Sequence, residues 1–367
     1  MEVILKEKRR KKILIIIIAV IFGLALGAAG YVAYKQYFSK ESWLEKSKTK
    51  PSASPKTTAN PLDGSQAPVD LANRHPLVVL IENQTQARPQ IGLDKASIVY
   101  EAITEGGITR FMAIYGQKDA KKVGPVRSIR TYFLDWAWEY NAFLGHCGGN
   151  IDALDRIEIE KPLDLDDFAL GEKAYWREPQ AGKAIEHTMY TDTEKLYAAA
   201  KEKGWQMIGD FTSFKFLKAQ DFKINPAISQ TIEIPFSSPQ YQVKYTWDSL
   251  NNNYPREMAG SPHKDRDTGN GLAPVNIIIQ SVERWETTTR INESGWAMKT
   301  IGEGKAYVIY GGQKIDASWK KTDLKSRTMF YDSSGKEISF LPGQFWYEIV
   351  PPDVFEKVSI ESKPSSS

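Results

Sequence analysis

The stretch ASIVYEAITEGGITRFMAIYG, residues 96–116, decides which kind of fold this chain can form. Residues 96–104 and 108–116 are rich in β-branched and aromatic side chains, which favour strands. The segment Glu105-Gly106-Gly107 between them suits a tight turn, so the whole stretch predicts a β-hairpin. The apolar run PLVVLIEN at 76–83 predicts a further buried strand just before the hairpin.

A predicted helix follows the hairpin at residues 128–140, SIRTYFLDWAWEY. Its apolar residues recur at spacings of three and four, the pattern of a helix with one buried face. Ser128 is a good N-cap residue, and it directly follows Pro125-Val126-Arg127. We therefore expect the helix to begin at Ser128.

Strands and helices continue to alternate beyond this helix. Residues 141–147 predict a strand, and Gly148-Gly149-Asn150 then opens a short helix. Thr191 and Glu194 form a capping box at the start of a helix that ends at Gly204. This alternation predicts an N-terminal α/β layered domain over residues 70–225.

From about residue 231 the pattern changes to β. The segment YQVKYTW at 241–247 alternates along the strand, and APVNIIIQSV at 273–282 predicts a more buried strand. Two hairpins, at 306–319 and 327–341, and a last strand, at 345–351, complete the series. We expect a small all-β domain, a sandwich or a barrel, over 231–360, which makes the fold class α+β overall.

The N-terminus predicts a membrane anchor. Residues 1–12 form a basic tail, and residues 13–34 form an uncharged, mostly aliphatic run that suits one transmembrane helix. Lys and Arg stay on the cytoplasmic side, so the domains after this helix are expected outside the cytoplasm, on a single-pass protein of the cell membrane. A cleaved signal peptide is the alternative, but the apolar run is longer than a usual signal core.

Two segments have the composition of disordered chain. Residues 35–69 carry Pro, Ser, Thr and Lys with almost no apolar side chain after Leu44, and residues 361–367 form a polar tail. The single cysteine, Cys147, allows no intramolecular disulfide. It also lies too far from the apolar run for a lipidated N-terminus.

Charge and histidine spacing argue against several classes of function. The net charge is +3, and six positive residues lie in the N-terminal tail, so nucleic acid is not the expected partner. The four histidines lie far apart, so no metal site and no cofactor are expected. HKDRDTGNG at 263–271 slightly resembles a calcium loop, but it lacks the spacing of an EF-hand, so a solvated loop is preferred.

Two arginines lie at the predicted start of the helix, in VGPVRSIRT at 123–131. Arg127 and Arg130 would flank Ser128, where free backbone N–H groups already favour an anion. Guanidinium groups add forked donors suited to phosphate or carboxylate. The alternative is structural: Arg127 could pair with Glu101 or Glu105 and hold the hairpin against the helix.

The hairpin itself carries three charged residues, Glu101, Glu105 and Arg110. A carboxylate within an apolar strand usually has a partner. Two carboxylates could also act as acid and base, but their separation cannot be deduced from spacing. A structural ion pair is the preferred interpretation.

The turn GHCGGN at 145–150 is a candidate pocket edge. Paired glycines after a strand allow a tight turn or a close approach by a ligand, so Gly148 and Gly149 suit this place. His146 and Asn150 would line such a pocket. Adjacent residues on a strand face opposite ways, so His146 is not expected to activate Cys147, which is interpreted as a packing residue.

Several tryptophans in the second half could stack on sugar rings, although core packing is the commoner role. These residues are Trp247, Trp285, Trp296, Trp319 and Trp346.

Six motifs together resemble the YerB-like bacterial envelope family, known as domain of unknown function family 3048. They are ARPQIGLDKASIVYEAITEGGITRFMAIYG at 87–116, VGPVRSIRTYF at 123–133, GHCGGN at 145–150, YTWDSLNNNYPREMAGSPHKD at 245–265, VNIIIQ at 275–280 and LPGQFWYEIVP at 341–351. The resemblance implies an extracytoplasmic protein with an α/β N-terminal domain and a C-terminal domain, often lipid-anchored. The apolar run at 13–34 departs from that lipid anchor, and no activity comes with the family.

Together these features predict a membrane-anchored protein that binds a component of the cell envelope, either a polymer or a protein partner. The expected pocket is formed by Glu101, Arg110, Arg127, Arg130 and residues 146–150. A transferase or hydrolase that acts on an anionic envelope polymer, or on its lipid-linked precursor, is the alternative. A purely structural scaffold would need no pocket.

Overall fold

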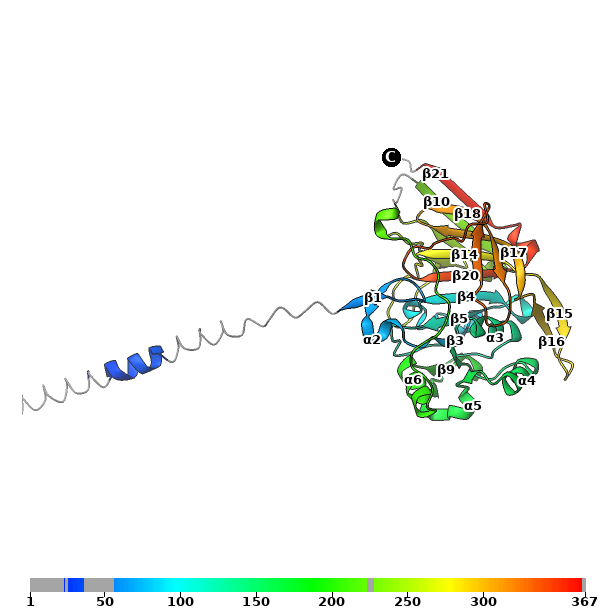
Figure 1. Ribbon diagram of the computed structural model, residues 1–367. Helices are drawn as coiled ribbons and strands as arrows, with labels where there is room; N and C mark the ends of the chain where they lie inside the picture. Colours follow the sequence, from blue (N-terminus) through cyan, green and yellow to red (C-terminus); the bar gives the residue numbers. More distant parts are fainter. Residues whose placement is uncertain (1–22, 24–25, 36–55, 223–227, 365–367) are drawn as a thin grey trace, which may run out of the picture. The chain divides into compact units, whose positions relative to one another are not determined.

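The computed structural model describes residues 23, 26–35, 56–222 and 228–364 (Figure 1). They fall into two compact units, one ending at Lys56 and the other beginning at Thr57. In the first unit, residues 26–35 are helical. Among the described residues, no helix is long and apolar enough to cross a membrane. The transmembrane helix expected at 13–34 lies largely outside the described residues and stays a prediction.

The second unit is built around one ten-stranded sheet with the strand order β19-β18-β17-β14-β20-β4-β5-β3-β6-β7. The predicted hairpin is confirmed as the antiparallel pair β4–β5. Its turn is the short helix η3 (Glu105–Gly107), in which Gly106 and Gly107 have positive φ angles of 67° and 73°. The strands of the sheet are β3 (Leu77–Glu82), β4 (Ile98–Ile103), β5 (Thr109–Tyr115), β6 (Phe143–Gly145), β7 (Leu163–Asp164), β14 (Asn276–Ser281), β17 (Gly302–Tyr310), β18 (Gln313–Lys321), β19 (Met329–Asp332) and β20 (Phe345–Val350).

This sheet contains strands from both halves of the chain. Strand β20 pairs in parallel with β14 on one side and with β4 on the other. All residues of β4 and β20 are buried, so both strands need neighbours on both edges and cover on both faces. The mixed α+β class and the sheet-rich second half are confirmed. The expectation of a separate sandwich or barrel is wrong, because its most buried strands complete the sheet of the first half.

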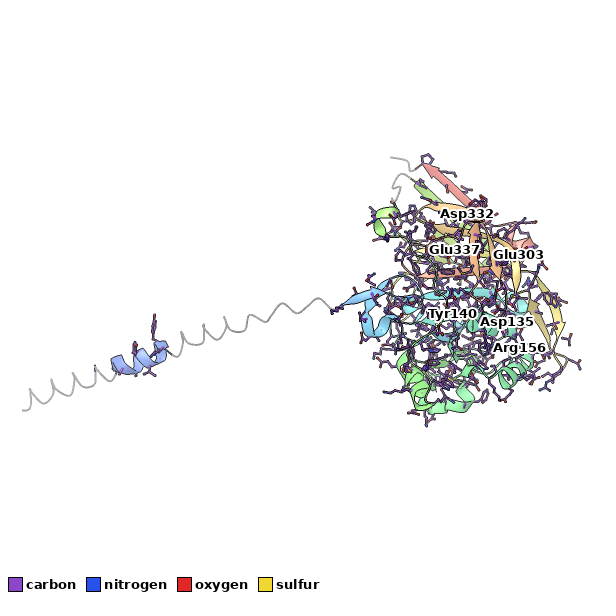
Figure 2. All side chains as sticks on the ribbon, viewed as in Figure 1. Asp135, Tyr140, Arg156, Glu303, Asp332 and Glu337 are labelled. Atoms are coloured by element: carbon purple, nitrogen blue, oxygen red, sulfur yellow. The ribbon has the colours of Figure 1, made fainter. Side chains whose placement is uncertain are left out.

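Helices cover both faces of the β3–β6 region. Val78 and Val79 are adjacent on β3 and therefore point to opposite faces. Val78 lies in one core cluster with Trp136 of α3, and Val79 lies in the other with Leu196 of α6. The helices are α2 (Val69–Ala72), α3 (Thr131–Trp138), α4 (Ile151–Glu160), α5 (Asp167–Leu170), α6 (Thr193–Glu202) and α7 (Pro352–Phe355). An ion pair of 2.7 Å between Asp135 Oδ1 and Arg156 joins α3 to α4 (Figure 2).

Two of the predicted helix starts are displaced. Helix α3 begins at Thr131 rather than at Ser128, and no side chain caps its N-terminus. Ser128 is therefore not an N-cap residue. Helix α6 is capped by Asp192, whose side chain accepts a hydrogen bond of 2.6 Å from the Lys195 amide, because Thr191 is still part of strand β9. A capping residue needs an extended backbone directly before the first helical turn, and residue type alone does not determine that position.

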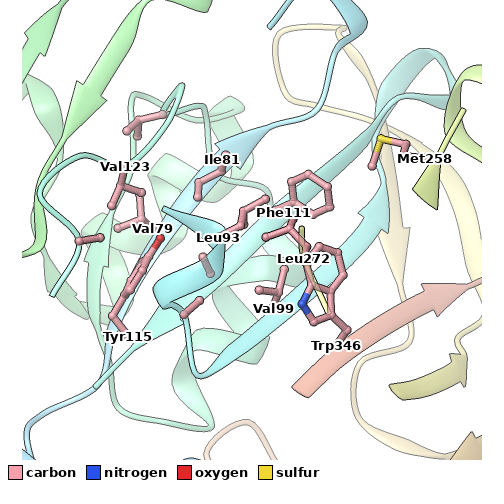
Figure 3. Packing of buried hydrophobic residues seen from close by; sticks show 14 of the residues in the cluster. Val79, Ile81, Leu93, Val99, Phe111, Tyr115, Val123, Met258, Leu272 and Trp346 are labelled. Atoms are coloured by element: carbon pink, nitrogen blue, oxygen red, sulfur yellow. The ribbon is translucent and has the colours of Figure 1, made fainter. Parts of the chain in front are cut away.

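A second, five-stranded sheet packs against the first. Its strand order is β13-β12-β11-β10-β21, and all neighbours are antiparallel. Alternate residues such as Ile232 and Tyr245 enter the core cluster that also contains Trp346 of β20 and Phe111 of β5 (Figure 3). Full burial of one such side chain contributes roughly 1.5–3 kcal/mol. The strands are β10 (Ile228–Pro235), β11 (Gln242–Thr246), β12 (Arg256–Met258), β13 (Ser261–Pro262) and β21 (Ser359–Pro364).

Both segments that were expected to be disordered contain strands. Residues 361–364 belong to β21, which pairs with β10, so their backbone groups are held in a sheet. Strands β1 (Thr57–Ala59) and β2 (Gln66–Pro68) form a hairpin, and Leu62 between them is buried. Both expectations are therefore wrong at these positions, because contacts far away in the sequence anchor these polar segments: β21 pairs with β10, and Asn60 in the 57–68 hairpin donates to Gln117. Residues 36–55 and 365–367 lie outside the described residues.

Two further two-stranded ribbons stand apart from the large sheets. The ribbon β15–β16 extends beside α3 and α4 (Figure 1). Thr300, just after β16, donates a hydrogen bond of 2.6 Å to Asp135 of α3, and Arg290 near the ribbon's tip pairs with Asp155 of α4. The strands of the two ribbons are β8 (Tyr175–Arg177), β9 (Met189–Thr191), β15 (Arg284–Thr288) and β16 (Ser294–Met298).

Candidate functional site

Arg130 connects the start of α3 to the hairpin turn η3. Its Nε donates to Oε1 of Glu105 over 2.7 Å, and its terminal nitrogen donates to Oε2 over 2.9 Å. Burial alone would raise the pKa of Glu105, but the hydrogen bonds and the charge of Arg130, with smaller contributions from its surroundings, together hold this pKa below its usual value. The bidentate pair gives Arg130, with Glu105 as its partner, the structural role that the sequence had suggested for Arg127.

Arg110 supports the same corner from inside. It is buried, and it donates a hydrogen bond of 2.6 Å to the backbone oxygen of Ser128. Burial, with the nearby charge of Arg130, lowers the pKa of Arg110 to about 10, so the guanidinium stays charged at neutral pH. Four predicted site residues, Glu105, Arg110, Ser128 and Arg130, thus lie together around the start of α3.

Arg127 pairs with Glu82, so the suggested pairing with Glu101 or Glu105 is wrong. Its Nε lies 3.2 Å from Oε1 of Glu82, whose other oxygen is 2.8 Å from Nδ1 of His187. Both Glu82 and His187 are buried, whereas Arg127 is partly exposed. Arg127 and Arg130 therefore neutralise separate carboxylates and do not form one anion cradle at the helix start.

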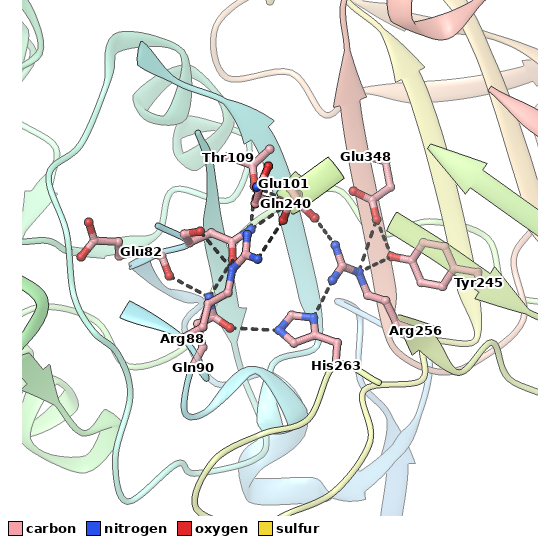
Figure 4. A network of polar contacts seen from close by, with 11 residues as sticks. Glu82, Arg88, Gln90, Glu101, Thr109, Gln240, Tyr245, Arg256, His263 and Glu348 are labelled. Atoms are coloured by element: carbon pink, nitrogen blue, oxygen red, sulfur yellow. Dashed lines mark hydrogen bonds and ion pairs between the residues drawn. The ribbon is translucent and has the colours of Figure 1, made fainter. Parts of the chain in front are cut away.

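Glu101 belongs to a buried network that links the two sheets (Figure 4). Arg256 of β12 donates to its Oε2, and Asn83 donates to its Oε1 over 3.2 Å. The same guanidinium donates to the hydroxyl of Tyr245 over 3.0 Å, and that hydroxyl donates to Glu348 of β20. The preference for a paired carboxylate at Glu101 is confirmed, but its partner comes from the second half of the chain.

Glu348 lies directly beside Glu101, because the two are register partners on the parallel strands β20 and β4. Both side chains are completely buried, and one guanidinium serves both carboxyl groups. Burial, together with the charge of Glu101, raises the pKa of Glu348 to about 8. The pair therefore holds a proton at neutral pH.

His263 extends this network. The guanidinium of Arg256 can only donate, so it donates to Nδ1 of His263, and Nε2–H then donates to Gln90 over 3.0 Å. Burial and the charge of Arg256 keep the pKa of His263 well below its usual value, so the imidazole is neutral. Arg256 thus fixes the tautomer of His263, and the hydrogen bond to Gln90 joins this histidine to the first half of the chain.

The GHCGGN turn is held by a carboxylate. His146 is buried, with Nε2 at 2.9 Å from Asp164 Oδ1 and Nδ1 at 2.8 Å from the Gly148 oxygen. Both ring nitrogens face acceptors, which favours the imidazolium. Burial opposes this charge, but the pairing with Asp164 outweighs it and raises the pKa of His146. Gly148 has a φ of +62°, and Asn150 caps α4 by accepting from the Ala153 amide over 3.3 Å.

Gly149 allows a close approach within the protein. A side chain there would place its first carbon 3.0 Å from both Ile129 and Leu154. The close approach at Gly149 is therefore made by side chains of this protein, where the sequence had also allowed a ligand.

Cys147 faces away from His146 and donates a weak hydrogen bond of 3.2 Å to Asp167. Burial, together with the carboxylate of Asp167, raises the pKa of the thiol to about 12. The thiolate that a nucleophile needs is therefore scarce at neutral pH.

We expect Cys147 to react with iodoacetamide at pH 8 more than roughly a hundredfold more slowly in the folded chain than in the urea-unfolded chain. Mass spectrometry of time points measures both rates. Equal rates would mean that the thiol is exposed and ionised, and the pairing with Asp167 would be wrong. Cys147→Ser should leave any binding activity unchanged.

An open groove lies between η3 and the ribbon β15–β16, with a volume of about 400 Å³. Its lining combines carboxylates, hydroxyls and one indole ring: Glu105, Gly106, Glu286, Thr287, Thr288, Ser294, Gly295 and Trp296. The guanidinium of Arg284 stacks on Trp296 with its central carbon 4.2 Å from the ring centroid, which fixes the ring. Within the described residues, Glu286 forms no ion pair. Of the residues predicted to bind a ligand, Glu105 lines this groove, and Arg130 positions it.

The other candidate tryptophans divide by burial. Trp247, Trp319 and Trp346 belong to the core, as their commoner role predicts. Trp285 is 52% exposed but does not line the groove. Of these five tryptophans, Trp296 is the one that lines the groove beside η3.

The loop 263–271 also has a structural explanation. The carboxylate of Asp265 accepts from the amides of Gly92, Asp267 and Thr268, at distances of 2.5, 3.0 and 3.2 Å. The bond from Gly92 fixes the loop against the first half of the chain, and the other two close the loop on itself. No group of three His, Cys, Asp or Glu side chains within the described residues is arranged to hold a metal ion.

Comparison with known proteins identifies the family. The chain matches the N-terminal domain of the DUF3048 proteins of unknown function over residues 62–206 and their C-terminal domain over residues 232–347. The chain belongs to the DUF3048 family. The putative lipoprotein YerB of Bacillus subtilis (strain 168) is 28% identical over 292 residues, which cover 79% of this chain and 86% of the relative.

A solved structure supports the same assignment for this DUF3048 protein. The crystal structure of the YerB protein from Bacillus subtilis matches with a TM-score of 0.72 and 28% identity. The match covers 83% of this chain and 100% of that chain. The family resemblance inferred from the sequence motifs is therefore confirmed.

Proposed function

We propose that this protein is an extracytoplasmic, membrane-associated binding module, and that it holds a component of the cell envelope in the groove between η3 and β15–β16. The observation that carries the proposal is the lining of this groove. It combines a fixed indole ring, hydroxyl groups that donate and accept, and two carboxylates. Flat aromatic rings with nearby polar groups suit the faces of sugars and the planes of peptides.

The charges of the groove favour a neutral or amine-bearing ligand. Glu105 and Glu286 both line it, and the guanidinium next to it, Arg130, is already bound by Glu105. An anionic ligand would compete with Glu105 for Arg130 and would face Glu286 as well. Amino sugars and amine-bearing peptides of an envelope polymer fit this arrangement best.

The structure does not support the anion site on which the enzyme hypothesis depended. That hypothesis required Arg127 and Arg130 to be free to bind an anion at the start of a helix. In the folded chain each of them is paired with a carboxylate, Arg127 with Glu82 and Arg130 with Glu105. Binding without turnover is the simpler proposal.

The proposed location follows from the relative and from the N-terminal sequence. A relative named as a putative lipoprotein is consistent with a membrane-associated protein outside the cytoplasm. Cys147, the one cysteine of this chain, lies in the folded body after β6. We therefore propose attachment through the apolar run at 13–34 instead of through a lipidated cysteine.

Trp296→Ala should weaken the binding of peptidoglycan fragments to the full chain by roughly tenfold, because the ring supplies the stacking surface. Isothermal titration calorimetry with a soluble disaccharide-peptide measures the affinity. Trp285→Ala is the matched control, since this exposed tryptophan on β15 does not line the groove. An equal loss in both variants, or no loss in either, would contradict the assignment of the groove.

A further inference from the structure

A second groove lies at the opposite end of the ten-stranded sheet from β7. Two adjoining hollows, of about 670 Å³ and about 220 Å³, share the lining residues Lys305, Phe355 and Glu356. They run between α7 and the last strands of the sheet, β17, β18 and β19. No lining residue is common to this groove and the groove at η3.

The floor of the groove is the open face of these strands. In the middle of β17, the half-exposed Tyr307 lies between Ala306 and Val308, which are buried in the core. Tyr307 lies on the open face and stacks on Phe355 of α7, with ring centroids 4.4 Å apart and an interplanar angle of 18°. The floor therefore offers a flat aromatic surface beside small side chains.

The walls are acidic. Five carboxylates line the two hollows, Glu283, Glu303, Asp316, Asp332 and Glu356, against two lysines, Lys299 and Lys305, so the difference is three negative charges. Lys299 pairs with Glu283 over 3.5 Å. Ion pairs do not neutralise Glu303, Asp332 or Glu356 within the described part of the chain. Glu303 and Asp332 both lie on this strand region (Figure 2).

The chain itself shows how this surface holds an ammonium group. Nζ of Lys314 lies 4.3 Å from the centroid of the Tyr307 ring and 2.9 Å from Oδ1 of Asp316. A ring face and a carboxylate thus already hold one lysine at the edge of the groove. Cation–π contacts of this kind add to charge attraction.

We propose that this groove binds an extended, lysine-rich segment of a partner protein. The exposed carboxylates attract its ammonium groups, and the Tyr307–Phe355 surface packs against the aliphatic parts of its side chains. The length across three strands and α7 suits an extended polypeptide. Anionic lipids and nucleic acids are disfavoured by the same charges. This role is separate from ligand binding at the groove beside η3.

The test uses the purified full chain and a fluorescein-labelled decalysine peptide, with decaglutamate as the reference, in fluorescence anisotropy at two salt concentrations. We expect decalysine to bind, and the double variant Glu303→Gln/Glu356→Gln to weaken this binding roughly five- to tenfold. The control Glu158→Gln/Glu361→Gln removes the same number of charges from α4 and β21. It should change the affinity for decalysine less than about twofold. Trp296→Ala, in the groove beside η3, should leave the affinity for decalysine unchanged.

Equal losses in the two double variants, or no binding of decalysine to the wild type, would overturn the proposal. Hydrogen exchange on the wild-type chain gives a second readout that needs no variant. Decalysine should slow exchange at residues 303–307 and 316–318. Protection elsewhere, without protection on these strands, would also overturn it.

Discussion

Arg256→Ala is expected to lower the free energy of unfolding by about 3–5 kcal/mol, because it leaves the buried carboxylate of Glu101 without its cation. The side chain is fully buried, and it donates to Glu101, Tyr245 and His263 from one guanidinium. It also stacks on Trp346, with its central carbon 4.3 Å from the ring centroid. Urea unfolding followed by circular dichroism measures the loss.

The matched control is Arg290→Ala. This arginine also pairs with a carboxylate, Asp155, but both side chains are exposed, and solvent screens the pair. Arg290→Ala should lower the free energy of unfolding much less than Arg256→Ala does. A change of less than about 1 kcal/mol for Arg256→Ala would mean that the network does not hold the two sheets together.

Glu348→Gln should remove part of the pH dependence of stability. The folded-state pKa of Glu348 is raised to about 8, above its unfolded value near 4.5. Between these two pH values the folded chain binds a proton that the unfolded chain releases. The group therefore lowers the free energy of unfolding as pH rises, by at most about 1.4 kcal/mol per pH unit, and the decline ends above the folded pKa.

Urea unfolding at half-unit steps from pH 4.5 to 9 measures this slope for the wild type and for Glu348→Gln. Glutamine mimics the protonated acid, so the variant should gain stability relative to the wild type as pH rises to about 8. The neighbours that face this carboxyl group, Glu101, Arg256 and Tyr245, are present in both proteins. Parallel pH profiles would show that Glu348 is ionised in the folded chain, and the shared-proton description would be wrong.

Much of the local structure follows from the sequence because its causes are local. The runs on either side of Glu105-Gly106-Gly107 form the expected hairpin, since the glycines supply the positive φ angles of the turn. The preference for paired carboxylates was also correct for Glu101 and Glu105. Burial makes an unpaired charge costly wherever the strand lies, so that conclusion needs no tertiary structure.

The joining of the two halves could not be predicted in the same way. The insertion of β20 beside β4 depends on contacts between residues roughly 250 positions apart, which no local pattern encodes. One signal was available. Tyr100-Glu101 and Tyr347-Glu348 are the same dipeptide in two apolar strands, and the fold places them side by side. Two buried carboxylates of this kind indicate a shared cation, and Arg256 in PREM is the residue that was missed.

The residues of the expected ligand pocket lie apart in the structure for a comparable reason. Arg127 and Arg130 are only three residues apart, but the helix begins after both of them and Arg130 has an extended backbone, so their side chains meet different partners. The groove beside η3 has its second wall in β15–β16, about 180 residues further along the chain. Hydroxyl-bearing and acidic residues in a ribbon carry no distinctive spacing, so the sequence alone could not join them to Glu105.

The most direct test of the binding account is hydrogen exchange, followed by mass spectrometry, on the full chain with and without a soluble peptidoglycan disaccharide-peptide. The account predicts that the ligand slows exchange at residues 104–108 and 284–298, on the two walls of the groove. Slower exchange at 127–130 and 146–150, with no change at the groove, would contradict this proposal. The ligand would then bind at the arginines and the GHCGGN turn.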